Sequence, residues 1–83
     1  MINNLKMNEL SKFVKHQRKM NGLTQVDLSK KSGTGLRFVK ELEAGKRTLR
    51  IDKVNDVLYL FGHELQPVTI RPGQAKLITT AIV

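Results

Sequence analysis

The sequence predicts a mainly α-helical domain of four to five short helices, followed by one β-strand near the C-terminus. Two observations lead to this fold class. Apolar residues recur at helical spacing in segments that end at a glycine, and the composition becomes β-prone after Gly62. The 83 residues are enough for one domain with a modest core.

The first predicted helix spans Met7–Met20 and carries lysines and an arginine between its apolar positions. Those apolar positions are Met7, Leu10, Phe13, Val14 and Met20. The pair Asn21-Gly22 ends this helix, since glycine readily takes the left-handed conformation after a last turn.

The second predicted helix begins at Thr24, runs to about Ser32 and stops at Gly33. Thr24 can cap the helix, and Asp27 can reach back to the backbone of the cap. A reciprocal pair of this kind is typical of a helix start.

The third predicted helix follows the corner Gly33-Thr34-Gly35 and ends at Gly45. We expect Thr34 to cap it. At about 100° per residue, its core face carries Phe38, Val39 and Leu42. Arg37 and Lys40 then point away from the core. Two short helices joined by a glycine-containing turn, with basic side chains on the second, are typical of a helix-turn-helix that enters the major groove of DNA.

The fourth predicted helix runs from about Arg50 to Phe61, and Gly62 closes it. Its apolar face carries Ile51, Val54, Val57, Leu58 and Phe61. The β-prone segment Glu64–Ile70 follows, and Pro67 places it at a sheet edge. Because one strand cannot satisfy its own backbone, we expect it to pair with the same strand of a second subunit. The predicted dimerisation residues are Leu65, Val68 and Ile70.

The positive charge is concentrated in one half of the chain. The net charge is +8, and Lys12–Arg50 contains eleven lysines and arginines against three acidic residues. A positive field confined in this way suits a polyanion such as DNA. The alternative is a solubilising basic surface.

The composition argues against several other classes of protein. The chain has no cysteine, which excludes disulfides, thiolate zinc sites and cysteine nucleophiles. His16 and His63 have no neighbouring ligand-type residues, and no catalytic triad or carboxylate pair is recognisable. We therefore expect no enzyme activity, no metal and no cofactor. Without a signal peptide or membrane-spanning run, the expected location is the cytoplasm, with no membrane partner.

The stretch LTQVDLSKKSGTGLRFVKELEAGK resembles the helix-turn-helix of the Cro/C1-type (XRE) family. The Leu-Thr-Gln start, the corner glycine and the Leu-Glu-x-Gly-Lys end carry the resemblance, which covers about Met7–Gly62. It implies a lambda-repressor-like domain. The longer stretch GLRFVKELEAGKRTLRIDKVNDVLYLFGHEL, followed by a strand, resembles the HipB-like antitoxin branch. That branch is dimeric, represses its own operon and binds a HipA-type kinase toxin.

Carried over by position, the resemblance implies a set of DNA-contacting residues. The groove-facing residues would be Thr34, Leu36, Arg37, Lys40 and Glu41, and the phosphate-binding residues Thr24, Gln25, Lys46 and Arg47. Alternatives remain for several of them. Arg37 could form a surface ion pair with Glu41, Lys40 could hold a phosphate, and Leu36 could lie at the core edge. Phe38 departs from the family pattern and could join the core or wedge against a sugar.

The expected organisation is a helix-turn-helix domain over residues 1–62, a dimerisation strand over 63–73 and a C-terminal tail over 74–83. The leading functional prediction is a sequence-specific, dimeric repressor of operator DNA that is also the antitoxin of a HipA-type kinase. One alternative is a free-standing XRE-family or phage-type regulator without a toxin. The other is a non-sequence-specific nucleic-acid binder.

Overall fold

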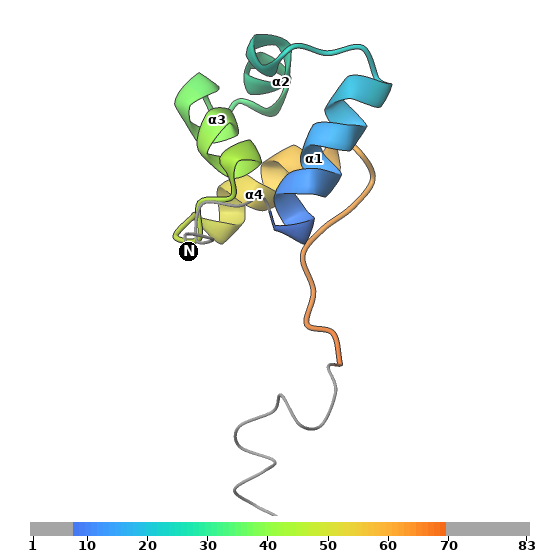
Figure 1. Ribbon diagram of the computed structural model, residues 1–83, viewed down its shortest axis with the longest axis vertical. Coiled ribbons are helices and arrows are strands. Elements are labelled where there is room, and N and C mark those ends of the chain that lie inside the picture. Colours follow the sequence, from blue (N-terminus) through green and yellow to red (C-terminus); the bar gives the residue numbers. More distant parts are fainter. Residues whose placement is uncertain (1–7, 70–83) are drawn as a thin grey trace, which may run out of the picture.

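The described part of the chain folds into four α-helices. The computed structural model describes residues 8–69 and contains α1 (Glu9–Met20), α2 (Gln25–Ser32), α3 (Leu36–Ala44) and α4 (Ile51–Tyr59). Figure 1 shows α2 at the top of the molecule, α3 and α1 on its two sides, and α4 behind them at the lower centre, with residues 63–69 running away from the helices at the opposite end. The prediction of a mainly helical domain is confirmed. No helix in the described part of the chain is long and apolar enough to span a membrane.

Side-chain caps decide where the first two helices begin. The Asn8 Oδ1 atom accepts a hydrogen bond from the Ser11 N–H at 2.8 Å. At α2, the Asp27 N–H donates to Thr24 Oγ1 at 3.0 Å, and the Thr24 N–H donates to Asp27 Oδ2 at 2.9 Å. This is the reciprocal capping pair that the sequence predicts. It stabilises the start of α2, because each side chain accepts a hydrogen bond from an otherwise unpaired N–H group.

The corner before α3 depends on two glycines with positive φ. Gly33 has φ 72° and Gly35 has φ 91°, values that residues with a Cβ rarely adopt. The predicted cap at Thr34 is wrong, since α3 begins one residue later and Gly35 occupies the cap position. The Thr34 hydroxyl lies instead 2.8 Å from Ser32 Oγ, and the Thr34 side chain is buried within the corner.

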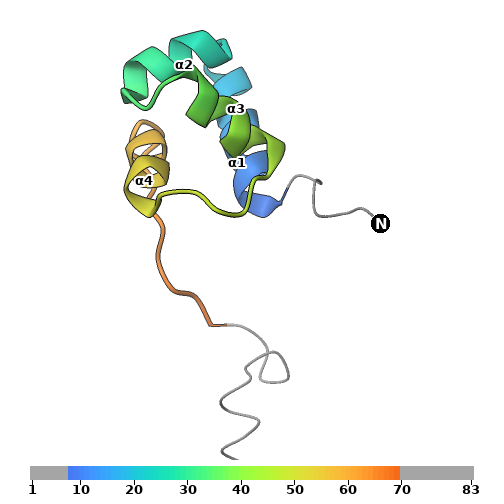
Figure 2. The same cartoon turned by 90° about the vertical axis from the view of Figure 1, so that its left-hand side faces the viewer.

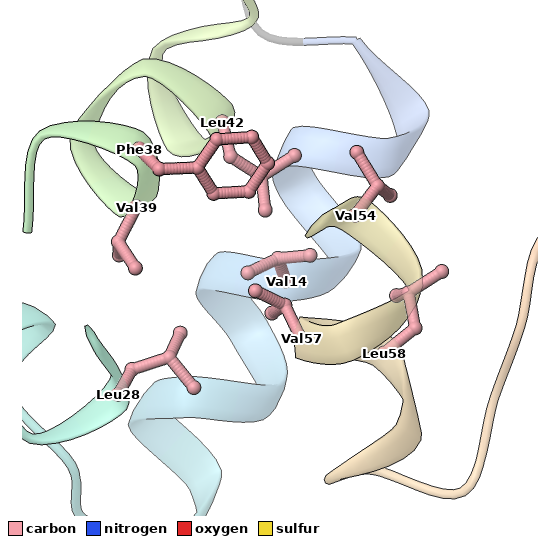
Figure 3. Close-up of a cluster of buried hydrophobic side chains, with 8 residues drawn as sticks. All are labelled: Val14, Leu28, Phe38, Val39, Leu42, Val54, Val57 and Leu58. Atoms are coloured by element: carbon pink, nitrogen blue, oxygen red, sulfur yellow. The ribbon is translucent and has the colours of Figure 1, made fainter. Parts of the chain in front are cut away.

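The apolar core lies where the four helices meet (Figure 3). It consists of Val14, Leu28, Phe38, Val39, Leu42, Val54, Val57 and Leu58. Phe38 is therefore a core residue, and the Lys53 ammonium lies 5.7 Å from the centroid of its ring. Two apolar residues assigned to buried faces are exposed, Met20 at 70% and Ile51 at 66%. Both are terminal residues of their helices, where the helical face extends past the core.

The segment after α4 is not a strand in this single chain. Residues 63–69 have no regular secondary structure, and Ile70 lies outside the described residues. The predicted strand is thus not supported, because a strand needs a neighbour for its backbone groups. The Leu65 N–H donates instead to Asn55 Oδ1 on α4 at 2.8 Å. The rest of the predicted strand region and the tail over 74–83 lie beyond the part that the structure describes.

Candidate nucleic-acid interface

α2, the corner and α3 form the helix-turn-helix unit, and α3 packs against both α2 and α1. Figure 2 shows α2 across the top of the molecule, α3 running down from it on the right with α1 behind, and α4 apart from them on the left. Leu28 of α2 and both Val39 and Leu42 of α3 are buried in the core, and Figure 3 shows Leu28 and Val39 facing each other. This packing fixes the direction of α3, and so fixes which of its side chains face solvent.

A buried ion pair locks the unit to α1. Arg18 Nε donates to Glu43 Oε2 at 2.6 Å, and Arg18 Nη2 donates to Glu43 Oε1 at 3.0 Å. The third donor, Nη1, reaches the carbonyl oxygen of Leu23 at 2.9 Å. Only 11% of the Arg18 side chain and 3% of the Glu43 side chain are exposed. Hydrogen bonding to Glu43 raises the pKa of Arg18.

Gln25 at the start of α2 belongs to the same network. Its Nε2 atom donates to Glu43 Oε1 at 3.1 Å, and its side chain is half-buried. The Glu43 carboxylate on α3 therefore orients Gln25, which is predicted to bind a DNA phosphate. Because α2 begins at this residue, the free N–H groups and positive dipole end of α2 lie beside it.

Sequence reasoning missed this network by counting Arg18 and Glu43 as surface charges. A signal was present, since Glu43 follows Val39 by one helical turn and so lies on the buried face of α3. A carboxylate on a buried face requires a charged partner. The sequence does not reveal which of the basic residues supplies it.

The residues predicted to face the major groove differ in their exposure. Arg37 is accessible, with 91% of its side chain exposed, and Lys40 is also exposed. Leu36 and Glu41 are partly buried. Thr34 is buried, with its hydroxyl committed to Ser32, so it is less available to a base than Arg37 or Lys40.

Glu41 brings together a predicted base-reading residue and a predicted phosphate-binding residue. Its Oε2 atom accepts from Arg37 Nε at 3.4 Å and from Lys46 Nζ at 3.3 Å. These two cations hold the pKa of Glu41 below its ordinary value, with the hydrogen bond from Lys46 as the larger cause. The surface ion pair considered for Arg37 is therefore present, and Lys46 shares it.

The remaining predicted phosphate ligands flank α2 and α3. Thr24 is exposed, although its hydroxyl accepts the capping hydrogen bond from Asp27. Arg47 is exposed and follows Lys46 in the loop that begins after Gly45. Basic side chains thus lie at the C-terminal end of α3, and free N–H groups lie at the start of α2. These groups are suited to DNA phosphates on either side of a groove.

A helix-turn-helix whose second helix exposes Arg37 and Lys40, with basic residues in the loop after it, defines a DNA-binding protein, not an enzyme. Residues 14–60, more than half of the chain, match the helix-turn-helix family. The chain belongs to the Cro/C1-type (XRE) helix-turn-helix family.

The chain is also similar to an uncharacterized HTH-type transcriptional regulator, y4mF, of Sinorhizobium fredii. The two are 37% identical over 68 residues, which cover 82% of this chain and 87% of the relative. No solved structure gave a significant match.

Proposed function

We propose that the protein is a sequence-specific transcriptional repressor that binds operator DNA as a homodimer. The observation that carries this proposal is the exposure of Arg37 on a helix whose opposite face is fixed in the core. A protein that binds only the DNA backbone needs no helix aimed in this way. The name of the Sinorhizobium relative, a transcriptional regulator, supports the same function.

In this proposal, Arg37 reads a guanine through its O6 and N7 atoms, which the guanidinium fits bidentately. Lys40 and Leu36 lie on the same helix and contact neighbouring bases, Leu36 through a thymine methyl group. Lys46 and Arg47 hold the phosphates on one side of the groove. The start of α2, with Thr24 and Gln25, holds a phosphate on the other side.

Selection of duplexes from a randomised library tests this function. We expect an enriched palindrome whose half-site centres lie about one helical turn apart, since each subunit supplies one α3. Affinities for the enriched duplex and for a random duplex of equal length are then compared at several salt concentrations. Equal affinity for both duplexes would refute sequence-specific binding.

The dimer is proposed to form through the segment after α4. Leu65 and Val68 are exposed there, and together with Leu10, Phe13 and Leu58 they line an apolar groove. Pairing of this segment with its copy across a two-fold axis would satisfy its backbone and cover the groove. Ile70 would extend the pairing beyond the described residues.

Two variants test the dimer by sedimentation. A chain that ends at His63 should be monomeric and should bind the enriched duplex much more weakly. Because this truncation also removes the hydrogen bond from Leu65 to Asn55, Val68→Asp provides a milder variant at an exposed position. Met20→Asp, at an exposed position at the end of α1, is the matched control and should stay dimeric. A dimeric Val68→Asp protein would move the interface elsewhere.

We further propose that the protein is the antitoxin of a HipA-type kinase and that it represses its own operon. The support is the resemblance of the stretch from Gly35 to Leu65 to the HipB-like branch. We place part of the toxin contact on residues 74–83, where Leu77, Ile78, Ile82 and Val83 are apolar.

The neighbouring reading frame tests the antitoxin role. It should encode a HipA-type kinase that copurifies with this protein and whose toxicity the protein neutralises. Removing residues 74–83 should weaken neutralisation and leave operator binding intact. Absence of such a kinase would leave a free-standing regulator, and unchanged neutralisation would move the toxin contact to the helical body.

A further inference from the structure

Glu41 places a negative charge on the face that is proposed to meet DNA. Its carboxylate accepts hydrogen bonds from both Arg37 and Lys46, at 3.4 Å and 3.3 Å. Its backbone carbonyl accepts a third, from the Lys46 N–H at 3.0 Å. Glu41 therefore joins Arg37, an exposed cation of α3, to the first cation of the loop that follows.

In the free protein, this carboxylate gives Arg37 and Lys46 the kind of partner that DNA would otherwise provide. A duplex must therefore compete with Glu41 for both cations. Glu41 also approaches the phosphates with like charge, which is repulsive. Both effects weaken the binding of any duplex, whatever its sequence.

A correctly placed base pair can offset these costs. The N4 amino group of cytosine and the N6 amino group of adenine are donors in the major groove, and a carboxylate can accept from cytosine N4. A guanine opposite Arg37 offers its O6 and N7 acceptors to the guanidinium and so compensates for the ion pair that Arg37 loses with Glu41. Such compensation is available only at a matching site, so the penalty falls mainly on other sequences.

We propose that Glu41 is a specificity-determining residue that suppresses binding to random DNA by holding Arg37 and Lys46 and by repelling phosphates. This inference deepens the proposed function and rests on it. The charge is present at neutral pH, because the neighbouring cations keep the pKa of Glu41 below its usual 4.5. The suppression is therefore constant across the neutral range and is not a pH switch.

The variant Glu41→Gln removes the charge and keeps the shape of the side chain. The backbone hydrogen bond from Lys46 is retained, since it uses the carbonyl oxygen of residue 41. Affinity is measured for the duplex enriched by the wild-type protein and for a random duplex of equal length. We expect the affinity for random DNA to rise about ten-fold, and that for the enriched duplex to rise less or to fall.

Two further variants separate this role from the effect of net charge. Asp56→Asn removes one carboxylate from the exposed surface of α4. Asp56 takes no part in the ion pairs of Arg37 and Lys46 with Glu41. Asp56→Asn should raise both affinities slightly and leave their ratio unchanged. Glu41→Asp keeps the charge and should keep most of the discrimination.

The outcomes distinguish this inference from the function on which it rests. Suppose that the wild-type protein prefers its enriched duplex. If Glu41→Gln then leaves the ratio of the two affinities unchanged, as Asp56→Asn should, Glu41 has no role in specificity. A loss of discrimination in Glu41→Asp as large as in Glu41→Gln would also overturn the role assigned to the charge. If the wild-type protein itself shows no preference, the proposed function fails as well.

Discussion

Replacing Arg18 with methionine should strongly destabilise the protein, because it leaves the Glu43 carboxylate buried without its cation. Arg18 makes three hydrogen bonds inside the protein, two to Glu43 and one to the Leu23 carbonyl. Methionine can fill much of the space of the arginine stem but provides no donor. After the substitution, the donor from Gln25 is the side-chain hydrogen bond that remains to Glu43.

The cost can be estimated from the burial of the pair. Removing one partner of a buried ion pair costs about 3–5 kcal/mol. The Leu23 carbonyl also loses its donor, although it can recover part of that energy from water. A chain of 83 residues has a total stability of about 4–12 kcal/mol. We therefore expect Arg18→Met to lose a quarter or more of the stability, and nearly all of it at the lower end of this range.

Urea unfolding followed by circular dichroism measures this change. The double variant Arg18→Met/Glu43→Leu should recover most of the loss, since an apolar pair of similar volume replaces both charges. Arg37→Ala is the control, because its solvent-exposed pair with Glu41 should contribute little to the stability. If Arg18→Met cost no more than Arg37→Ala, or if the double variant were as unstable as the single one, the network would not be a buried ion pair.

Four other substitutions have expected results. Thr24→Ala should cost about 1 kcal/mol in urea unfolding, since it removes the cap of α2. The pKa of Asp27 is lowered first by the Thr24 N–H, so the stabilisation from Asp27 is present above its usual pKa of 3.8. That stabilisation should disappear as the pH falls through the lower folded pKa. Thr24→Ala removes the hydroxyl, the second cause of the lowered pKa, and keeps the N–H, so the loss of stability in acid should be only slightly smaller in this variant. Leu42→Ala should cost about 2–5 kcal/mol by leaving a cavity among the four helices, measured in the same way. In DNA titrations, Arg37→Ala should cost about 1–3 kcal/mol and relax one base position per half-site. Lys46→Ala should instead weaken all sequences alike and reduce the salt slope by about one. Equal losses on enriched and random duplexes for Arg37→Ala would reassign Arg37 to the phosphates.

The helices and their limits could be predicted because local chemistry governs them. The cap of α2 needs only Thr24 and Asp27, three residues apart, and Gly33 and Gly45 end helices with positive φ. The exposed faces of α3 followed from angle alone, which placed Arg37 and Lys40 away from Val39 and Leu42. Each of these inferences concerns residues within about two turns of one helix.

The errors occurred where a residue has two local options. Thr34 could cap α3 or pair with Ser32, and the packing of the corner selected the second. Met20 and Ile51 continue the apolar pattern of their helices, yet their positions at helix ends place them outside the core. The strand predicted after His63 is a different case, because it needs a second chain to pair with; in the single chain the Leu65 N–H donates to the Asn55 side chain instead.

The sequence by itself determined that this protein is a small, basic helix-turn-helix domain, since helical period, caps and corner glycines are read within short windows of the chain. Only the tertiary structure revealed how its charges are distributed between core and surface. Arg18 and Glu43 are 25 residues apart, and Lys46 and Arg37 meet at Glu41 only because α3 ends where its chain turns back at Gly45. The physical reason is that the energy of a charge depends on its burial and its partners. Burial and partners are properties of the packed helices. The sequence alone does not select which of the eleven basic residues in this half of the chain pair with its three acidic residues.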